Sequence, residues 1–288
     1  MAIADDRALS QASLQDYVEC PYRFRLRYLD RLEWPAVEAE PAGRYERLRR
    51  DGAEFHRMVH QYLLGVPAER LRSLAEHRSE PGGGDGLADW WRSFCEHRPA
   101  DLPGEHYPEV TLAAEVAGRR LAAKYDLIVV QEGSAVILDW KTAGRRPRDM
   151  TVEGRLQTRV YPYLLALAGG VLNGGVPIAP ERIVMSYWYA AFPNEPTVIS
   201  YDRVRFDADR AYLSGLLQEI SERPPDGFER TEDRDRCKLC TYRSLCGRGE
   251  AAGEMDPEAD AEQDFSLPVD AGDEALGFDY AEVGQVSF

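Results

Sequence analysis

The stretch Leu121–Thr142 reads Leu-Ala-Ala-Lys-Tyr-Asp-Leu-Ile-Val-Val-Gln-Glu-Gly-Ser-Ala-Val-Ile-Leu-Asp-Trp-Lys-Thr, and it decides the fold. Two apolar runs rich in Val, Ile and Leu are separated by Glu132-Gly133-Ser134, a sequence typical of a tight turn. Together with a similar run before them, they predict three consecutive strands at 110–116, 120–130 and 135–140. The last two strands each carry one aspartate in an otherwise apolar environment, Asp126 and Asp139.

Apolar residues at helical spacing flank these strands on both sides. They predict helices at 53–64, 87–97, 155–168 and 207–223, the last with Asp207 as its cap. The region 10–32 is also expected to be helical, with Ser10 or Ser13 as a cap and with Pro21 interrupting it or opening a second helix. Further strands are expected at 182–189 and 197–201. This order of elements predicts an α/β (α+β) fold with helices around a central mixed sheet.

The distribution of charge divides the chain in two. The 288 residues carry a net charge of −15, but twelve acidic residues and no Lys or Arg lie from Glu250 onward, which leaves −3 for residues 1–249. The composition of 250–288 predicts a disordered acidic tail behind a nearly neutral body that can carry basic patches. No signal-peptide pattern and no bilayer-length apolar run is visible, so we expect a cytoplasmic protein without a membrane role.

Asp126, Asp139 and Lys141 are the residues most suggestive of chemistry. Asp139 and Lys141 are two positions apart, so on a strand their side chains share one face. Two carboxylates can hold a hard divalent cation through oxygen, and a lysine can stabilise charge that develops on a phosphate. This pattern favours metal-assisted phosphodiester hydrolysis. The alternative is a salt bridge at the end of a strand, which an isolated Asp-x-Lys more often represents.

Other side chains could complete such a site. Gln157 and Tyr161 are four apart on the helix that follows and so share a face, although by default they form a half-buried surface pair. His56 could bind a metal or contact the scissile group, but a lone helical histidine more often packs. Arginines after Lys141 suit a phosphate backbone, or else a solvated loop. These candidate DNA-binding residues are Arg145, Arg146, Arg148, Arg155 and Arg159.

The cysteines point to a second metal centre. Cys237, Cys240 and Cys246 form a C-x₂-C-x₅-C array, which needs a fourth ligand to hold zinc or an iron–sulfur cluster. Cys20 is the better candidate and Cys95, in a Trp-rich helical segment, the weaker. A ligand at Cys20 would join the two ends of the domain like a clasp; we use "clasp" below for Cys20 together with residues 237–246. Spacing alone does not exclude zinc.

Taken together, these motifs resemble the PD-(D/E)xK nucleases of the RecB/AddB type, in the branch with an iron–sulfur cluster that includes the CRISPR-associated adaptation exonucleases. The resemblance covers roughly residues 8–249 and rests on six motifs that are weak singly but occur in the family's order. They are Leu9–Phe24, Gly52–His56, Tyr125-Asp126, Leu138–Thr142, Gln157–Tyr161 and the cysteine array. Lys124-Tyr125 departs from the family, where a small residue such as Gly usually stands two positions before the aspartate.

The resemblance implies a restriction-endonuclease-like core and a role for each matching residue. His56, Asp126, Asp139 and the backbone carbonyl of Trp140 would hold Mg²⁺ or Mn²⁺, and Lys141 would be the catalytic lysine. Gln157 and Tyr161 would match a Q-x-x-x-Y motif that places DNA and active-site groups. Ligands of a mainly structural [4Fe–4S] cluster would be Cys20, Cys237, Cys240 and Cys246.

The expected function is therefore a metal-dependent DNA nuclease, an exonuclease or end-processing enzyme on single-stranded DNA in repair, recombination or foreign-DNA processing. The alternative is a DNA- or partner-binding subunit of a larger complex with little or no cleavage. The expected domain organisation is a nuclease domain at 1–249, closed by the clasp, followed by the tail at 250–288. The tail could mimic DNA or dock on a helicase, a clamp or another protein, but a solubilising segment is the simpler interpretation.

Overall fold

The structure is a computed structural model that describes residues 8–33, 42–78, 86–99, 102–238 and 240–249. The acidic tail predicted at 250–288 lies outside these residues. Within them, the strands form a three-stranded sheet in the order β1-β4-β3 and a five-stranded sheet in the order β2-β5-β6-β7-β8. The strands are β1 (Leu9–Ser10), β2 (Glu105–Pro108), β3 (Thr111–Val116), β4 (Arg119–Lys124), β5 (Leu127–Gln131), β6 (Ser134–Lys141), β7 (Ile183–Tyr189) and β8 (Phe192–Ser200).

Both sheets are mixed. β1 runs parallel to β4, and β6 runs parallel to β7, whereas the other neighbours are antiparallel. The α/β class with mixed sheets is thus confirmed. The five-stranded sheet is the expected central mixed sheet, and the second, three-stranded sheet was not expected.

The strands divide between two sheets because the chain bends between β4 and β5. We predicted a single strand at 120–130, but β4 ends at Lys124 and β5 begins at Leu127 in the other sheet. The partner segment changes sheet at the same level, between β2 and β3, where Glu109 takes a left-handed backbone with φ 53°. Backbone hydrogen bonds continue across the bend: the Tyr125 amide donates to the Val110 carbonyl, and the Glu109 amide donates to the Asp126 carbonyl. Asp126 therefore lies at a corner, where strands that switch sheets must bend.

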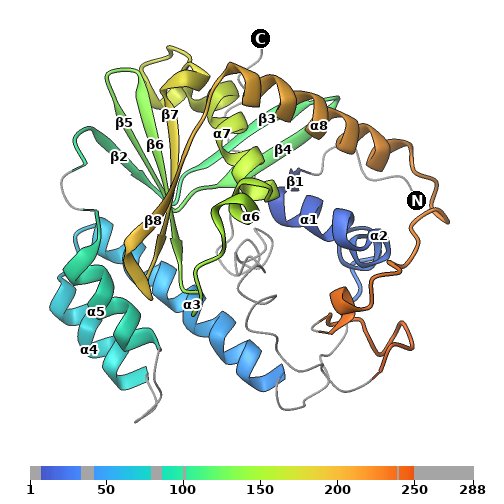
Figure 1. The fold of residues 1–288 in the computed structure, drawn as a ribbon, viewed down its shortest axis with the longest axis horizontal. Helices are drawn as coiled ribbons and strands as arrows, with labels where there is room; N and C mark the ends of the chain where they lie inside the picture. Colours follow the sequence, from blue (N-terminus) through green and yellow to red (C-terminus); the bar gives the residue numbers. More distant parts are fainter. Residues whose placement is uncertain (1–7, 34–41, 79–85, 100–101, 239, 250–288) are drawn as a thin grey trace.

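Helices cover both faces of the five-stranded sheet (Figure 1). The helices of the described residues are α1 (Gln11–Glu19), α2 (Pro21–Phe24), the π-helical turn η1 (Arg25–Leu29), α3 (Ala42–Leu63), α4 (Ala68–Arg78), α5 (Leu87–His97), α6 (Asp149–Glu153), α7 (Leu156–Ala168), α8 (Arg203–Glu222) and the short 3₁₀ helices η2 (Gly169–Leu172), η3 (Pro180–Arg182) and η4 (Asp235–Cys237). Among the described residues, no helix is both long enough and apolar enough to cross a membrane.

The strand alternation divides the core into two clusters. On β5 and β6, Ile128 and Ile137 face a cluster shared with α1, α7 and α8, whereas Leu127 and Leu138 face a second cluster shared with α3, α4 and α5. The second cluster is rich in aromatic rings, including Trp90, Trp91, Phe94, Trp140 and Trp188. Burying these apolar faces, at roughly 25 cal/mol per Å², is the main source of the fold's stability.

Most helix predictions hold, with shifts at the ends. Ser10 caps α1 through a capping box with Ser13, and Pro21 opens α2. The helix predicted at 53–64 is the second half of α3. The cap predicted at Asp207 is wrong, because α8 begins one turn earlier, where the Asp202 side chain accepts a hydrogen bond from the Arg205 amide. Sequence analysis did not predict β2, α4 or α6.

Candidate functional site

The strand β6 delivers Asp139 and Lys141 to one face of the five-stranded sheet. Ala135 and Ile137, at the preceding alternate positions, belong to the cluster under α7, so Asp139 and Lys141 continue the row that faces this helix. Both side chains are buried, with 3% and 8% of their surface exposed. Buried charges are costly unless they are paired, so their partners decide whether the arrangement is tenable.

Asp139, Lys141 and Gln157 form a closed triangle. The Lys141 ammonium lies 2.8 Å from Asp139 Oδ2 and donates to Gln157 Oε1 at 2.9 Å. The Gln157 amide in turn donates to Asp139 Oδ1 at 2.6 Å. Each side chain thus orients the other two. The salt-bridge alternative considered from the sequence is therefore present in this structure, but it is part of a larger constellation.

Asp126 approaches from the corner between β4 and β5. Its Oδ1 lies 3.0 Å from His56 Nδ1 on α3, and its Oδ2 accepts a hydrogen bond of 2.8 Å from the Trp140 amide. Burial favours the neutral forms of both groups, but their mutual attraction outweighs it, so the pKa of His56 is raised and that of Asp126 lowered. Because Trp140 directly follows Asp139 in the chain, the hydrogen bond from its amide to Asp126 holds the two aspartates close together.

Tyr161 lies one turn after Gln157 and is directed into the core. Its ring stacks at an angle on Tyr125, with the ring centroids 4.8 Å apart, and its carbonyl accepts a hydrogen bond from the Tyr125 hydroxyl at 2.9 Å. Tyr125 immediately precedes Asp126. The position of Tyr161 therefore points to support of the corner that carries this carboxylate.

Tyr187, on the neighbouring strand β7, was missed in the sequence. It is directly opposite Asp139 in the parallel register, and the Lys141 ammonium lies 5.4 Å from the centre of its ring, within range of a cation–π interaction. Its hydroxyl shares a hydrogen bond of 2.7 Å with Thr158, the residue after Gln157. Period-2 alternation along 183–189 was the available signal, but only the pairing of β7 with β6 gives it meaning.

The donor chemistry of this site suits a hard divalent cation. Asp126 and Asp139 supply carboxylate oxygens, the ligands that Mg²⁺ and Mn²⁺ prefer. Among the described residues, no three His, Cys, Asp or Glu side chains stand as a ready metal-binding group. A cation would therefore have to share the carboxylate oxygens now bonded to His56, Lys141 and Gln157, and to draw further ligands from backbone carbonyls or water.

The five candidate arginines differ in their surroundings. Arg146 donates to the Glu195 carbonyl and pairs with Asp149, and Arg159 pairs with buried Asp209 at 2.8 Å. Arg145 and Arg148 are exposed in the connection after β6, and Arg155 is half-buried at the start of α7.

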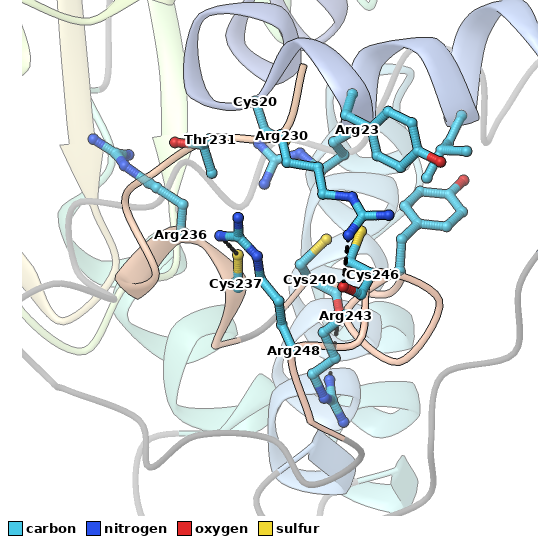
Figure 2. A pocket seen from close by; sticks show the side chains of 13 residues that line it. Cys20, Arg23, Arg230, Thr231, Arg236, Cys237, Cys240, Arg243, Cys246 and Arg248 are labelled. Carbon is cyan, nitrogen blue, oxygen red and sulfur yellow. Dashed lines mark hydrogen bonds between the residues drawn. The ribbon is translucent and has the colours of Figure 1, made fainter. Parts of the chain in front are cut away.

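Four cysteines line one pocket at the other end of the molecule (Figure 2). Cys237, Cys240 and Cys246 come from the C-terminal segment, and Cys20 lies between α1 and α2. Cys95 instead packs against the aromatic cluster under α5. Four thiols are the number and type of ligands that a tetrahedral zinc ion or a [4Fe–4S] cluster takes, so the residues fit either group by their chemistry, although their side chains do not stand as a ready metal-binding group.

Arginines surround the same pocket. Arg248 donates to Cys237 Sγ at 3.3 Å, and Arg23, Arg230, Arg236 and Arg243 also line it (Figure 2). Burial raises the pKa of the Cys240 thiol, and the positive charge of Arg23 opposes that rise. Such cations would balance the charge of thiolates if these bound a metal.

Hydrogen bonds and ion pairs hold the chain ends together around this pocket. The Tyr22 amide donates to the Glu229 carbonyl at 3.0 Å, and the Tyr242 hydroxyl donates to the Leu32 carbonyl at 2.9 Å. Glu19 pairs with both Arg23 and Arg236, the latter at 3.0 Å. Contacts within the protein therefore connect the two ends of the described chain around this pocket.

Comparisons with known proteins place the chain in a family. No curated protein sequence matches it. Two solved structures resemble it weakly. One is the protein SSO0001, with 12% identity, coverage of 85% of this chain and 87% of that one, and a TM-score of 0.39. The other is a "putative exonuclease" from Eubacterium rectale, with 11% identity, 94% of each chain covered and a TM-score of 0.45.

The sequence profile of the PD-(D/E)XK nuclease superfamily matches residues 8–247. This range contains every residue of the carboxylate–lysine site, which we define as His56, Asp126, Asp139, Lys141 and Gln157, and also the whole of the clasp. It covers well over half of the 288 residues. The chain therefore belongs to the PD-(D/E)XK nuclease superfamily.

Proposed function

We propose that this protein is a Mg²⁺- or Mn²⁺-dependent deoxyribonuclease that acts as an exonuclease or end-processing enzyme on single-stranded DNA. The observation that carries the proposal is the convergence of Asp126, Asp139 and Lys141 from the corner and from β6, with Gln157 bound to two of them. The superfamily supports a nuclease, and the geometry supplies the parts for metal-assisted hydrolysis.

Each residue of the carboxylate–lysine site has a distinct task in this proposal. Asp126 and Asp139 would hold the cation, with the Trp140 carbonyl and His56 as further protein ligands. A cation held there would supply polarisation of the phosphate and a water molecule of lowered pKa. Lys141 would stabilise negative charge on the phosphate, and Gln157, which accepts a hydrogen bond from Lys141, would orient the Lys141 ammonium. Tyr161 supports the corner through Tyr125.

The clasp has a structural role in the same proposal. Cys20, Cys237, Cys240 and Cys246 would hold a [4Fe–4S] cluster and fix the N-terminal helices to the end of the nuclease domain at 1–249.

Arg145, Arg148 and Arg155 would contact the DNA backbone, with Arg146 and Arg159 holding the loop and α7 in place. The tail at 250–288 would be a separate segment open to a protein partner.

A gel assay tests the activity. DNA labelled at the 5′ or the 3′ end, single- or double-stranded, is incubated with the full chain and Mg²⁺ or Mn²⁺. We expect degradation of single strands that stops in EDTA and that falls on the order of 10³-fold in Lys141→Ala. The matched control is Lys124→Ala, which removes an exposed lysine that pairs with Glu109.

Two results would contradict the proposal. Undiminished degradation by Lys141→Ala would show that the site lies elsewhere. Tight binding of DNA by the wild-type chain without cleavage under any of these conditions would favour the binding-subunit alternative.

A further inference from the structure

The outer faces of α3 and α4 enclose a second hollow, separate from the clasp and open to solvent, of about 690 Å³. We call it the α3–α4 groove. Its lining contains three arginines, one histidine, two uncharged polar residues and three aliphatic ones, and no carboxylate. These residues are Arg57, Gln61, Val66, Arg70, Leu71, Ser73, Leu74, His77 and Arg78.

Helical periodicity explains why the groove is basic. Arg57 and Gln61 are four apart on α3, and Arg70, Leu74 and His77 follow at three- or four-residue spacing on α4, so each set occupies one helix face. The acidic residues of α4 lie on the neighbouring face. There Arg72 pairs with both Glu69 and Glu76, which leaves one net negative charge on that face and none on the face that lines the groove.

The charge of the groove is only partly compensated. One carboxylate, Glu54, reaches both Arg57 and Arg78, at 2.5 and 2.8 Å. The side chain of Arg70 makes no ion pair or hydrogen bond with any residue that the structure describes, and it is exposed. With Glu54 counted and His77 neutral, the groove keeps two positive charges above an apolar floor of Val66, Leu71 and Leu74.

The groove and the carboxylate–lysine site share the helix α3. His56, which contacts Asp126, directly precedes Arg57, so one helix carries a residue of the site and a wall of the groove. A polymer with regularly spaced negative charges that is bound at Asp126 would reach these arginines within a turn or two of α3. An aliphatic floor beneath cations suits the combination of phosphate with sugar or base.

We infer that the α3–α4 groove binds the phosphodiester backbone of single-stranded DNA as the strand passes the carboxylate–lysine site. The inference rests on the proposed function and adds a track for the substrate. The arginines we had selected from the sequence lie after β6 and on α7, and two of them are committed to internal ion pairs. The groove supplies further cations, from α3 and α4.

Fluorescence anisotropy of a labelled single-stranded 20-mer tests the groove, with the full chain in EDTA so that no cleavage occurs. The test variant is Arg57→Gln/Arg70→Gln/Arg78→Gln. The control, Arg72→Gln/Arg92→Gln/Arg210→Gln, makes the same charge change at exposed, ion-paired arginines elsewhere. Because each lost phosphate contact changes the salt slope by about 0.7, we expect roughly 10- to 50-fold weaker binding at physiological salt and a shallower slope for the groove variant alone.

Arg70→Gln provides a second measurement that does not depend on the stability of the triple variant, because its side chain supports no other contact. It should weaken binding about fourfold. A groove variant that binds like the control, with an unchanged salt slope, would overturn the inference. The inference would also be overturned if the groove variant bound DNA normally but no longer bound a synthetic peptide of residues 250–288. That result would assign the groove to the acidic tail.

The same experiments separate this inference from the proposed function. Cleavage that depends on Lys141 but is indifferent to the groove variant would remove only the groove. A wild-type chain that neither binds nor cleaves DNA would remove both.

Discussion

The carboxylate–lysine site and the clasp are assembled in opposite ways. The site takes Asp126 from the corner just before β5, and Asp139 and Lys141 from β6, the antiparallel neighbour of β5. The clasp joins Cys20 to Cys237 and Cys246, more than two hundred residues away. In the site the buried charges bond to one another, whereas in the clasp four thiols face a shared pocket among arginines.

This difference concerns what each region depends on. The site is fixed by strand pairing and by α7, so the core of the domain supports it directly. The clasp closes most of the chain into a loop, and the entropic cost of such closure must be offset by contacts at the junction. Surface ion pairs contribute little to that balance, so a bound group held by the thiols would dominate it.

The largest effect is expected at the clasp. Cys20→Ser should abolish the brown colour that a [4Fe–4S] cluster would give an anaerobic preparation, and should lower Tm on the order of 10 °C, because it removes one of the four proposed ligands that join the chain ends. Cys95→Ser is the matched control, since Cys95 packs under α5, and it should keep the colour and shift Tm by only a few degrees. Absorption spectra and thermal unfolding provide the readouts.

Two outcomes would break the comparison. Equal loss of colour in both variants would show that Cys20 is not a specific ligand of the cluster. A colourless wild-type protein that contains zinc would show that the four cysteines bind zinc, not an iron–sulfur cluster, and would leave the clasp itself in place.

An intermediate effect is expected at Tyr187, behind the site. Tyr187→Phe keeps the ring near the Lys141 ammonium and removes the hydroxyl that bonds to Thr158, whereas Tyr187→Leu removes both the ring and the hydroxyl. A buried cation–π contact contributes about 2 kcal/mol, so kcat should fall roughly tenfold or more in Tyr187→Leu, with KM little changed, and less than threefold in Tyr187→Phe. Steady-state kinetics on a labelled oligonucleotide measure both. Equal losses in the two variants would mean that the hydroxyl, not the ring, matters.

The smallest effect is expected where α3 crosses the end of β6. A Cβ at Gly52 would lie 3.1 Å from Thr142 Oγ1, so Gly52→Ala should fail to give the stabilisation of about 1 kcal/mol that alanine usually confers in a helix. In a Thr142→Ala background the same change should stabilise, because the hydroxyl is gone. Urea unfolding of the four proteins measures this coupling. Identical effects of Gly52→Ala in both backgrounds would show that the close approach imposes no constraint.

The sequence was most informative where one short segment determines the outcome. Strand alternation predicted that Asp139 and Lys141 share a face, and helical spacing predicted that Gln157 and Tyr161 share a face of the helix that follows. The roles of these residues in catalysis stay predictions. Their contacts could be anticipated because β5, β6 and α7 are adjacent both in sequence and in space.

Features that depend on distant pairing could not be predicted in this way. The bend at Tyr125-Asp126 falls inside a run that reads as one continuous strand, and only the division into two sheets reveals it. Tyr187 becomes meaningful only through its register with Asp139. Similarly, Arg159 has the sequence context of a DNA contact, but Asp209, fifty residues later, binds it.

The bend at Asp126 also has a mechanical meaning. β4, which ends just before the bend, pairs with β1, and β1 leads through α1 to Cys20. Asp139 belongs to the other sheet. The distance between the Asp126 and Asp139 carboxylates therefore depends on how the two sheets pack against each other. A displacement of the N-terminal helices would act on Asp126 first, through β1 and β4, and not directly on Asp139.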